Sequence, residues 1–541
     1  MLCPNIVLLI TIILSSHRVA SQPNIITILT DDQGFGDAGF NCDNSTNLCA
    51  NTPNLDALAQ SQSSAYFHRF YSAAGVCSPT RAALLTGRTN ERSCIENALK
   101  CDNENPATTC SMGKGLPWNE FTTADAAKKA GYATTMIGKW HLGDLWEKTD
   151  VPGYAGNYSS PSQHGFDHWI QTEAEASNSM PNCGCFPINH TSPGPKPPSG
   201  YPSITPHGDQ CVVGGGHPSD WCYPCTNYFQ PNATDPRGVS AWPNKIPGND
   251  AHFIVDQFLE FLDKSIVDKK KFYAHLTFHA IHEPHPAMPE FYDMYEKDPD
   301  YLGALTMFDV ELGRLIQQLK VKKVYNNTVI LYTADNGPHQ GEERSDIHYS
   351  TNFLRQCKAS IFEGGIRVPG IIHSPMHISS FINVTTPTVT SDFLPTIMEL
   401  LNVQSDHPTW VIDGMSLVNI MQGNTLPTAR RPDNKYIGIK WGTSEAIIDN
   451  QWKLMSTPNK GQCTWQEPYA SMKKFDPYYL FDLNSDYHEL YDQKSKFPVK
   501  FAAMMKLMKE FKASLLNSQQ NESGCGRNVT VYRKVAEELN F

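Results

Sequence analysis

The sequence predicts an α/β protein with a large, doubly wound, mostly parallel sheet and a smaller C-terminal α+β domain. Two observations support this class. Continuous apolar, β-branched runs suit strands covered on both faces, and amphipathic helical segments separate these runs. The predicted strands are residues 24–30, 132–137, 272–278 and 329–334. The predicted helices are residues 52–64, 122–131, 250–265 and 301–320.

The later part of the chain follows a different pattern. Four short strand-like runs succeed one another and precede a single amphipathic helix at residues 499–516, an order that is typical of a small α+β unit. The runs are residues 435–441, 445–449, 451–455 and 478–482. We therefore predict an α/β domain over residues 22–430 and a C-terminal α+β domain over residues 431–541.

The first 21 residues predict a secretory signal peptide. An apolar run at residues 6–14 is too short to cross a bilayer, and small residues around Ser21 suit cleavage. No later run is long and apolar enough for a membrane span. We expect a product of the secretory pathway, either secreted or lysosomal.

Composition agrees with that compartment and excludes one class of partner. The chain has 15 cysteines and eight Asn-x-Ser/Thr sequons, as expected for a disulfide-bonded glycoprotein. The net charge of −11 argues against nucleic acid as a partner. The sequence carries no prediction of the oligomeric state.

Residues 143–248 form a long stretch rich in Pro, Gly, Ser and Asn, with five cysteines. Stretches this long are uncommon in a compact domain and are usually functional or insertional. Cys222 and Cys225 have the spacing of a zinc site, but the secretory context favours disulfides. We predict a disulfide-braced lid that shapes a substrate site.

Polar side chains follow each predicted strand of the α/β domain. Because ligands of open α/β sheets bind beyond the carboxyl ends of the strands, these groups are expected to share one crevice. An isolated Asp-Asp or Asp-Asn-Gly is more often a turn, but its position after a buried strand favours a binding role. The groups are Asp31 and Asp32, Lys139 and His141, His279, His282 and His285, and Asp335 and Asn336. Among them His279 and His285 keep the more frequent structural role of a lone histidine, although His285 could contact substrate.

The segment from Cys77 to Arg88 predicts a short helix with both ends marked. Ser78 suits the cap, Pro79 the first helical position and Gly87 a left-handed exit. Cys77 then lies where unpaired N–H groups favour an anion, and Arg81 shares its face. The alternative is a disulfide half or a buried small residue.

Cys-x-Pro-x-Arg followed by Leu-Leu-Thr-Gly-Arg resembles the signature of type I sulfatases. The resemblance extends from Pro23 to about Asp492 and is weakest in the lid. It implies an alkaline-phosphatase-like fold and hydrolysis of sulfate esters, either aryl sulfates or sulfated sugars, to inorganic sulfate and an alcohol. It also implies that a formylglycine-generating enzyme oxidises Cys77 to formylglycine, whose hydrate attacks sulfur.

The same resemblance implies a metal site. Asp31, Asp32, Asp335 and Asn336 match the sulfatase ligands that, together with the modified Cys77, hold one divalent cation. A set of oxygen ligands with three carboxylates suits a hard ion, and calcium is the expected one.

The remaining family roles fall on five residues. Lys139 and Lys358 match the two lysines that contact sulfate, and Arg81 is expected to help them stabilise charge on the transferred group. His141 matches the base that acts on the formylglycine hydroxyl. His282 matches the histidine that protonates the leaving oxygen.

Cysteine pairing is also implied by the resemblance. Sulfatases often link the loop before the second sulfate lysine to the C-terminal domain, and Cys463 is the only other cysteine between Cys225 and Cys525. We therefore expect a disulfide between Cys357 and Cys463.

Two other functions remain open. Phosphomonoesterases and phosphodiesterases of the same superfamily share the sheet and the aspartates, but they generally use Ser or Thr with two zinc ions. A silent binder of sulfated glycans is expected to lack some core residues, and this chain retains them. The natural substrate, whether an aryl sulfate, a glycosaminoglycan or an algal polysaccharide, is not predicted.

Overall fold

The computed structural model describes most of the predicted α/β domain and most of the C-terminal domain. The described residues are 22–42, 49–99, 115–145, 147, 159–172, 184–186, 221–223, 228–235, 238–243, 250–282, 287, 289–340, 350–423, 431–432, 435–456, 463 and 477–522. The predicted signal peptide, most of the predicted lid and His285 lie outside them.

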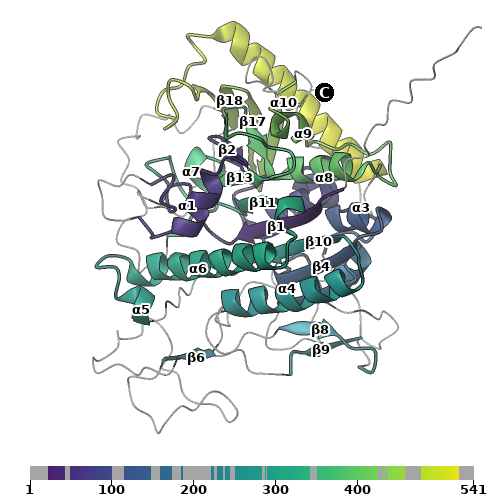
Figure 1. Ribbon diagram of the computed structural model, residues 1–541. Helices are drawn as coiled ribbons and strands as arrows, with labels where there is room; N and C mark the ends of the chain where they lie inside the picture. The colour runs from purple at the N-terminus through teal and green to yellow at the C-terminus, as the bar shows by residue number, and fades with distance from the viewer. Residues whose placement is uncertain are drawn as a thin grey trace, which may run out of the picture.

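A ten-stranded mixed sheet forms the centre of the molecule (Figure 1). Its five central strands are mutually parallel, and antiparallel neighbours extend both edges. In spatial order the strands are β14 (Ile382–Val384), β2 (Ser64–Phe67), β13 (Gly370–His373), β11 (Thr328–Ala334), β1 (Asn24–Thr30), β10 (Phe272–Thr277), β4 (Ala133–Lys139), β5 (His168–Thr172), β8 (Phe229–Pro231) and β9 (Val239–Ala241).

Helices cover both faces of this sheet, because alternate side chains of a buried strand point to opposite sides. Ile26 and Ile28 of β1 pack in one apolar cluster with α1 (Pro53–Ala59), α4 (Asp250–Val267) and α6 (Pro299–Val321). Ile25 and Leu29 pack in the other with α2 (Cys77–Thr86), α3 (Thr123–Lys129) and α8 (Phe393–Leu401). The predicted doubly wound α/β architecture is confirmed.

The register of the parallel strands brings their carboxyl ends together. Thr30 of β1 pairs with Ala334 of β11, and Leu29 pairs with Thr277 of β10. Thr277 in turn pairs with Gly138 of β4. The polar residues that follow these strands therefore meet at one edge of the sheet.

A second, four-stranded antiparallel sheet lies near the C-terminus. Its order is β16 (Ile437–Trp441), β17 (Ser444–Asp449), β18 (Trp452–Ser456) and β19 (Tyr478–Asp482). One face packs on α10 (Pro498–Asn521), which crosses this sheet in Figure 1. The other face contributes to a cluster with Tyr71, Ala83 and Ile361. The predicted small α+β unit is confirmed.

Short elements complete the described chain. A three-stranded sheet contains β12 (Arg367–Val368), β3 (Phe70–Tyr71) and β15 (Thr388–Val389). A two-stranded sheet contains β6 (Gly184–Phe186) and β7 (Trp221–Tyr223). The short helices are α5 (Pro289–Tyr292), α7 (Glu363–Ile366) and α9 (Val418–Met421). The predicted helix over residues 52–64 is too long, because the chain leaves α1 at Ala59 and enters β2 at Ser64.

Disulfides are present, and one of them was predicted. Cys357 bonds to Cys463 as expected, and Cys42 bonds to Cys49. Among the described residues only Cys77 is a free cysteine, and it is buried. None of the described helices combines the length and the apolarity that a membrane span requires.

Candidate active site

Three carboxylates and an amide lie where β1 and β11 end. Asp31 and Asp32 follow β1, while Asp335 and Asn336 follow β11, and all four are buried. The Asp32 N–H donates to Asp335 Oδ1 at 3.2 Å. Asp32 has a positive φ of 57°, so the chain turns sharply after β1. The carboxylates of Asp31 and Asp32 therefore both stay at the edge of the sheet.

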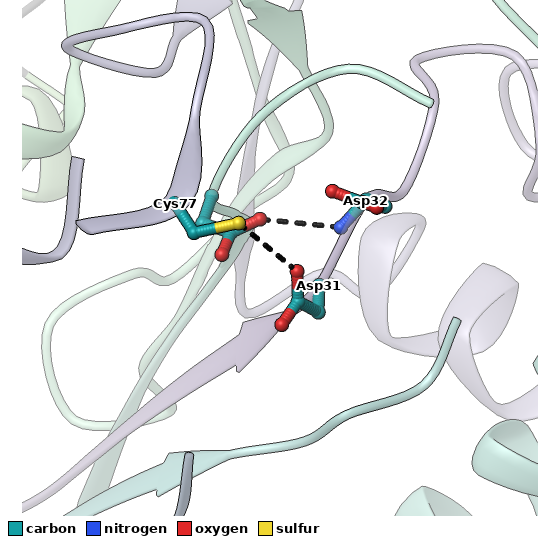
Figure 2. Close-up of side chains that lie close together, drawn as sticks. Asp31, Asp32 and Cys77 are labelled. Atoms are coloured by element: carbon teal, nitrogen blue, oxygen red, sulfur yellow. Dashed lines mark hydrogen bonds between the residues drawn. The ribbon is translucent and has the colours of Figure 1, made fainter. Parts of the chain in front are cut away.

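Helix α2 delivers Cys77 to the same place. The Cys77 sulfur donates to Asp31 Oδ1 at 3.5 Å, and Figure 2 shows the thiol directed at this carboxylate. Gly87 ends the helix with a φ of 66°, as predicted. The predicted Ser78 cap and Pro79 start are wrong, because the helix begins at Cys77 with Val76 as its cap. The Ser78 hydroxyl instead accepts a hydrogen bond from Leu99 N–H.

Arg81 ties the carboxylates of both strands together. Its guanidinium donates to Asp335 Oδ2 at 2.7 and 3.1 Å and to Asp31 Oδ2 at 3.1 Å. A further N–H donates to the Lys139 carbonyl at 2.9 Å. The predicted shared face of Cys77 and Arg81 is confirmed, since both contact Asp31.

Two lysines and a histidine lie beside the aspartates. Lys139, at the end of β4, lies 2.5 Å from Asp31 Oδ2, and Lys358 lies 2.7 Å from Asp32 Oδ2. His282 follows β10 and places Nε2 3.7 Å from the same Asp32 oxygen. Three separate segments of the chain thus bring a basic side chain to one carboxylate cluster.

His141 is buried beside the first turn of α2. Its Nε2 lies 2.7 Å from the Leu99 carbonyl, while the Leu99 N–H donates to Ser78 Oγ. This arrangement joins His141 through Leu99 to the residue that follows Cys77. His279 has a structural environment instead, with Asp250 at 2.5 Å from Nδ1 and Thr172 at 2.8 Å from Nε2.

The ligand geometry suits one hard cation. Potential ligand atoms of Asp31, Asp32, Cys77 and Asp335 all lie within 4.8 Å of one another. Asn336 donates through Nδ2 to Asp32 and to the Gly337 carbonyl. Its Oδ1 is buried and accepts no hydrogen bond from the residues that the structure describes. A buried amide oxygen left in this way beside three carboxylates is a fitting cation ligand.

The charges shift the acidities of these groups in different directions. Burial alone would raise the pKa of Asp31, but Lys139, His282 and Arg81 hold it well below its usual range. Burial and the charge of Asp31 raise the pKa of Asp335 to about 6. Burial, followed by the charges of Asp31 and Asp335, raises the pKa of the Cys77 thiol well above its ordinary value.

Sequence reasoning missed the network that supports the Asp31–Asp32 turn. Asp37 accepts hydrogen bonds from Gly34 N–H and from the Tyr301 hydroxyl, each at 2.5 Å, and from Ser350. At Gly34 a Cβ atom would lie 2.2 Å from the Ser350 carbonyl oxygen, so only glycine allows this approach. The residues Gly34, Gly36 and Asp37 indicate a turn from the local sequence alone. Their partners Tyr301 and Ser350 lie too far away in the sequence to be predicted in this way.

Comparison with known proteins places this arrangement in a class. The chain carries buried carboxylates, a lysine and a helix-borne cysteine at the carboxyl edge of a mostly parallel sheet. The Sulfatase family model matches residues 23–403, and the chain belongs to this family. It is accordingly a sulfuric ester hydrolase of the arylsulfatase type.

Individual relatives agree. N-acetylgalactosamine-6-sulfatase of Canis lupus familiaris is 28% identical, over 81% of this chain and 73% of its own length. Arylsulfatase A of Bos taurus is 29% identical, over 87% of this chain and 83% of its own length. At the level of fold, the crystal structure of Ps i-CgsB in complex with k-i-k-neocarrahexaose matches with a TM-score of 0.65 at 22% identity, covering 91% of this chain and 93% of that one.

Proposed function

We propose that this protein hydrolyses sulfate esters with formylglycine at position 77 and one bound calcium ion. The observation that carries this proposal is the position of Cys77, whose sulfur lies within a cluster of three buried aspartates. A disulfide half or an inert core cysteine has no need of such neighbours. The hydrated aldehyde supplies one hydroxyl as nucleophile and a second hydroxyl that allows sulfate to leave.

The charge balance of the site supports a bound cation. Asp31, Asp32 and Asp335 carry three negative charges, and Arg81, Lys139 and Lys358 match them with three positive charges. Without a metal the charges nearly cancel, which is a poor environment for an anionic sulfate ester. A divalent cation makes the site strongly positive and lets it attract the substrate.

The residues that would hold this ion are Asp31, Asp32, Asp335 and Asn336, together with the modified Cys77. Oxygen donors dominate the set, and no histidine belongs to it, which favours calcium over zinc. The bound ion would supply positive charge beside the transferred group. The unpaired Asn336 oxygen is the strongest single argument for this assignment.

The basic side chains divide into two roles. Arg81 uses three of its contacts on ligand carboxylates and one on a carbonyl, so we assign it mainly to positioning these carboxylates. Lys139 donates to Asp31 Oδ2 at 2.5 Å, and Lys358 donates to Asp32 Oδ2 at 2.7 Å. We assign these two lysines to binding the sulfate group and stabilising its charge in the transition state.

The histidines serve different proton transfers. His282 lies on the open side of the carboxylate cluster, with its side chain 11% exposed, and we assign to it protonation of the leaving alcohol. His141 is buried next to the start of α2, and we assign to it removal of a proton from the second hydroxyl at position 77. The two groups therefore act in successive half-reactions.

The proposed compartment is the secretory pathway, because disulfides persist in oxidising compartments. Asn326, Asn383 and Asn521 begin sequons and are exposed, as glycosylation requires. The names of the relatives favour sulfated sugars and aryl sulfates as substrate classes. Secreted and lysosomal locations fit these features equally.

Three measurements on the purified secreted protein test the proposal. Peptide mass spectrometry is expected to find formylglycine at position 77, and elemental analysis is expected to find one calcium per chain. The protein should release inorganic sulfate from an aryl sulfate, and Cys77→Ala should abolish this release while it keeps the fold. Unmodified Cys77 in active, folded protein would contradict the proposal.

Matched sulfate and phosphate esters of one phenol separate the phosphatase alternative. The aspartate cluster that could hold a metal contains no histidine among the described residues, whereas a two-zinc phosphatase needs several. We expect the sulfate ester to be the preferred substrate. Faster turnover of the phosphate ester, together with two zinc ions per chain, would overturn the assignment.

A further inference from the structure

A pocket separate from the catalytic cluster lies at the boundary of the large sheet and the C-terminal sheet. Its volume is about 310 Å³, and its lining includes His68 and Arg69, which follow β2, and Arg367, which begins β12. Asn484 and Tyr487, beyond β19, complete its polar wall. No carboxylate is present among the described residues that line it.

This pocket shares a sheet edge with the catalytic cluster. Strand β13 is antiparallel to both β11 and β2, so β2 runs in the same direction as β11. The carboxyl end of β2, where His68 and Arg69 lie, therefore faces the same side as Asp335. Two strand spacings separate β2 from β11, which corresponds to about 10 Å.

Two chain segments connect the pocket to the catalytic cluster. Arg367 packs over the ring of Phe35 at 4.5 Å, three residues beyond the ligand Asp32. On the other side, His488 follows Tyr487 and lies with Nδ1 2.7 Å from the Phe353 carbonyl, on the loop that carries Lys358. Both segments thus link the wall of the pocket to residues near the catalytic cluster.

The two arginines are held in fixed positions. Arg69 donates to the Thr385 carbonyl at 2.9 and 3.3 Å and to the Asn450 carbonyl at 3.0 Å. Arg367 donates through Nε to the His68 carbonyl at 2.9 Å. Carbonyl partners orient the guanidinium groups without neutralising them, which leaves positive charge for an anion.

The nearest carboxylate does not compete strongly for this charge. Glu363 lies 3.9 Å from Arg367, beyond hydrogen-bond distance. It already accepts a hydrogen bond from Tyr71 and pairs with Lys453, each at 3.0 Å. Burial, together with Arg367 and Arg69, lowers the pKa of His68, in keeping with a positive environment.

Tyr487 adds an aromatic surface at the pocket. It is 46% exposed, and the neighbouring Phe353 is 40% exposed. Exposed aromatic rings beside fixed cations suit a ligand that has both apolar ring faces and anionic substituents. Sulfated sugars have both features, whereas a simple aryl sulfate is too small to reach from the catalytic cluster to this pocket.

We infer that the pocket of Arg69, Arg367 and Tyr487 binds a second anionic group of a sulfated oligosaccharide whose scissile sulfate lies at Cys77. The inference rests on the proposed sulfate-ester hydrolysis and narrows its substrate class to extended, multiply charged glycans. Arg69 and Arg367 contact the distal sulfate or carboxylate, and Tyr487 packs against a sugar ring.

Competition kinetics on the full-length mature enzyme test this inference. The reporter is 4-methylumbelliferyl sulfate, and the competitors are tetrasaccharides of chondroitin sulfate, heparan sulfate and carrageenan, beside galactose 6-sulfate. We expect at least one tetrasaccharide to inhibit. Arg69→Gln should weaken that inhibition about tenfold, as loss of a charge-assisted contact predicts. Tyr487→Ala should weaken it up to about tenfold, as loss of aromatic packing predicts. Neither variant should change inhibition by galactose 6-sulfate or the KM of the reporter.

Two controls separate binding from damage to the fold. Tyr491→Ala removes an exposed tyrosine, 66% accessible, from the same segment but outside the pocket, and it should leave every constant unchanged. Arg69→Lys keeps the charge and should restore part of the affinity. Unchanged tetrasaccharide inhibition in Tyr487→Ala, or no inhibition by any tetrasaccharide, overturns the inference. Absence of reporter turnover in the unmutated protein would instead refute the proposed function.

Discussion

Arg81 is the residue whose replacement best tests the electrostatic account of the site. In the structure its guanidinium neutralises Asp31 and Asp335, and all three side chains are nearly inaccessible, with Arg81 2% exposed. Arg81→Gln removes this positive charge but retains a polar side chain. The two buried carboxylates are then short of one cation, and a bound calcium ion becomes the main source of compensation.

The size of the effect follows from this geometry. Removing one partner of a buried ion pair costs about 3–5 kcal/mol of folding free energy when the other charge stays uncompensated. That loss applies in full to the metal-free protein. With calcium bound the loss should be smaller by about 1.4 kcal/mol or more, which by linkage equals at least tenfold tighter calcium binding. The variant should be less stable and yet bind its metal more tightly.

Thermal unfolding in calcium and in chelator, together with calcium titration, measures both quantities. Arg431→Gln is the matched control, because Arg431 makes an equally buried two-bond pair with Asp392, at 2.7 and 2.9 Å, outside the candidate site. The control should lose stability equally in both conditions. Equal losses with and without calcium in Arg81→Gln would refute the charge-balance reasoning.

Three further outcomes are expected. His282→Ala should slow the hydrolysis of sugar sulfates by about 10²–10⁴ and that of activated aryl sulfates much less, because a phenolate needs little protonation to leave. Hydrolysis rates for a series of esters with different leaving-group pKa values measure this difference. His141→Ala should show a burst of alcohol without matching release of inorganic sulfate in stopped-flow assays. Burial raises the pKa of Glu120 to about 7, above the unfolded value of 4.5, so its contribution to stability is present at low pH and lost as pH rises through 7. The free energy of unfolding of Glu120→Gln, measured by denaturant titration, should therefore rise by about 3 kcal/mol relative to that of the unmutated protein between pH 4.5 and pH 8.

Much of the fold was predictable because its central strands carry strong local patterns. Strand β1 occupies the predicted residues 24–30, since seven consecutive strand-forming residues end at two aspartates. The short strands β2, β13 and β14 have no such signal. They have four, four and three residues, and their pairing partners lie far away in the sequence. Nothing local distinguishes them from loops.

The site shows the same division between local and distant information. The positions of Asp31, Asp335 and Lys139 followed from strand ends that must share an edge of a parallel sheet. The error at Ser78 came from a distant partner, because its hydroxyl contacts Leu99 rather than capping α2. Arg81 contacts carboxylates that follow two different strands, a geometry that no local pattern encodes.

The proposed ligand set offers a physical reason for the proposed conversion of Cys77 to formylglycine. Asp31, Asp32, Asp335 and Asn336 present hard oxygen donors, and the Cys77 sulfur is the one soft atom of the cluster. A hard cation such as calcium binds oxygen in preference to sulfur, so the unmodified chain presents it with a mismatched ligand. Replacing sulfur by hydroxyl oxygen would make the set uniform and would also provide two hydroxyl groups on one carbon. In the proposed mechanism, metal binding and sulfate release therefore place the same chemical demand on position 77.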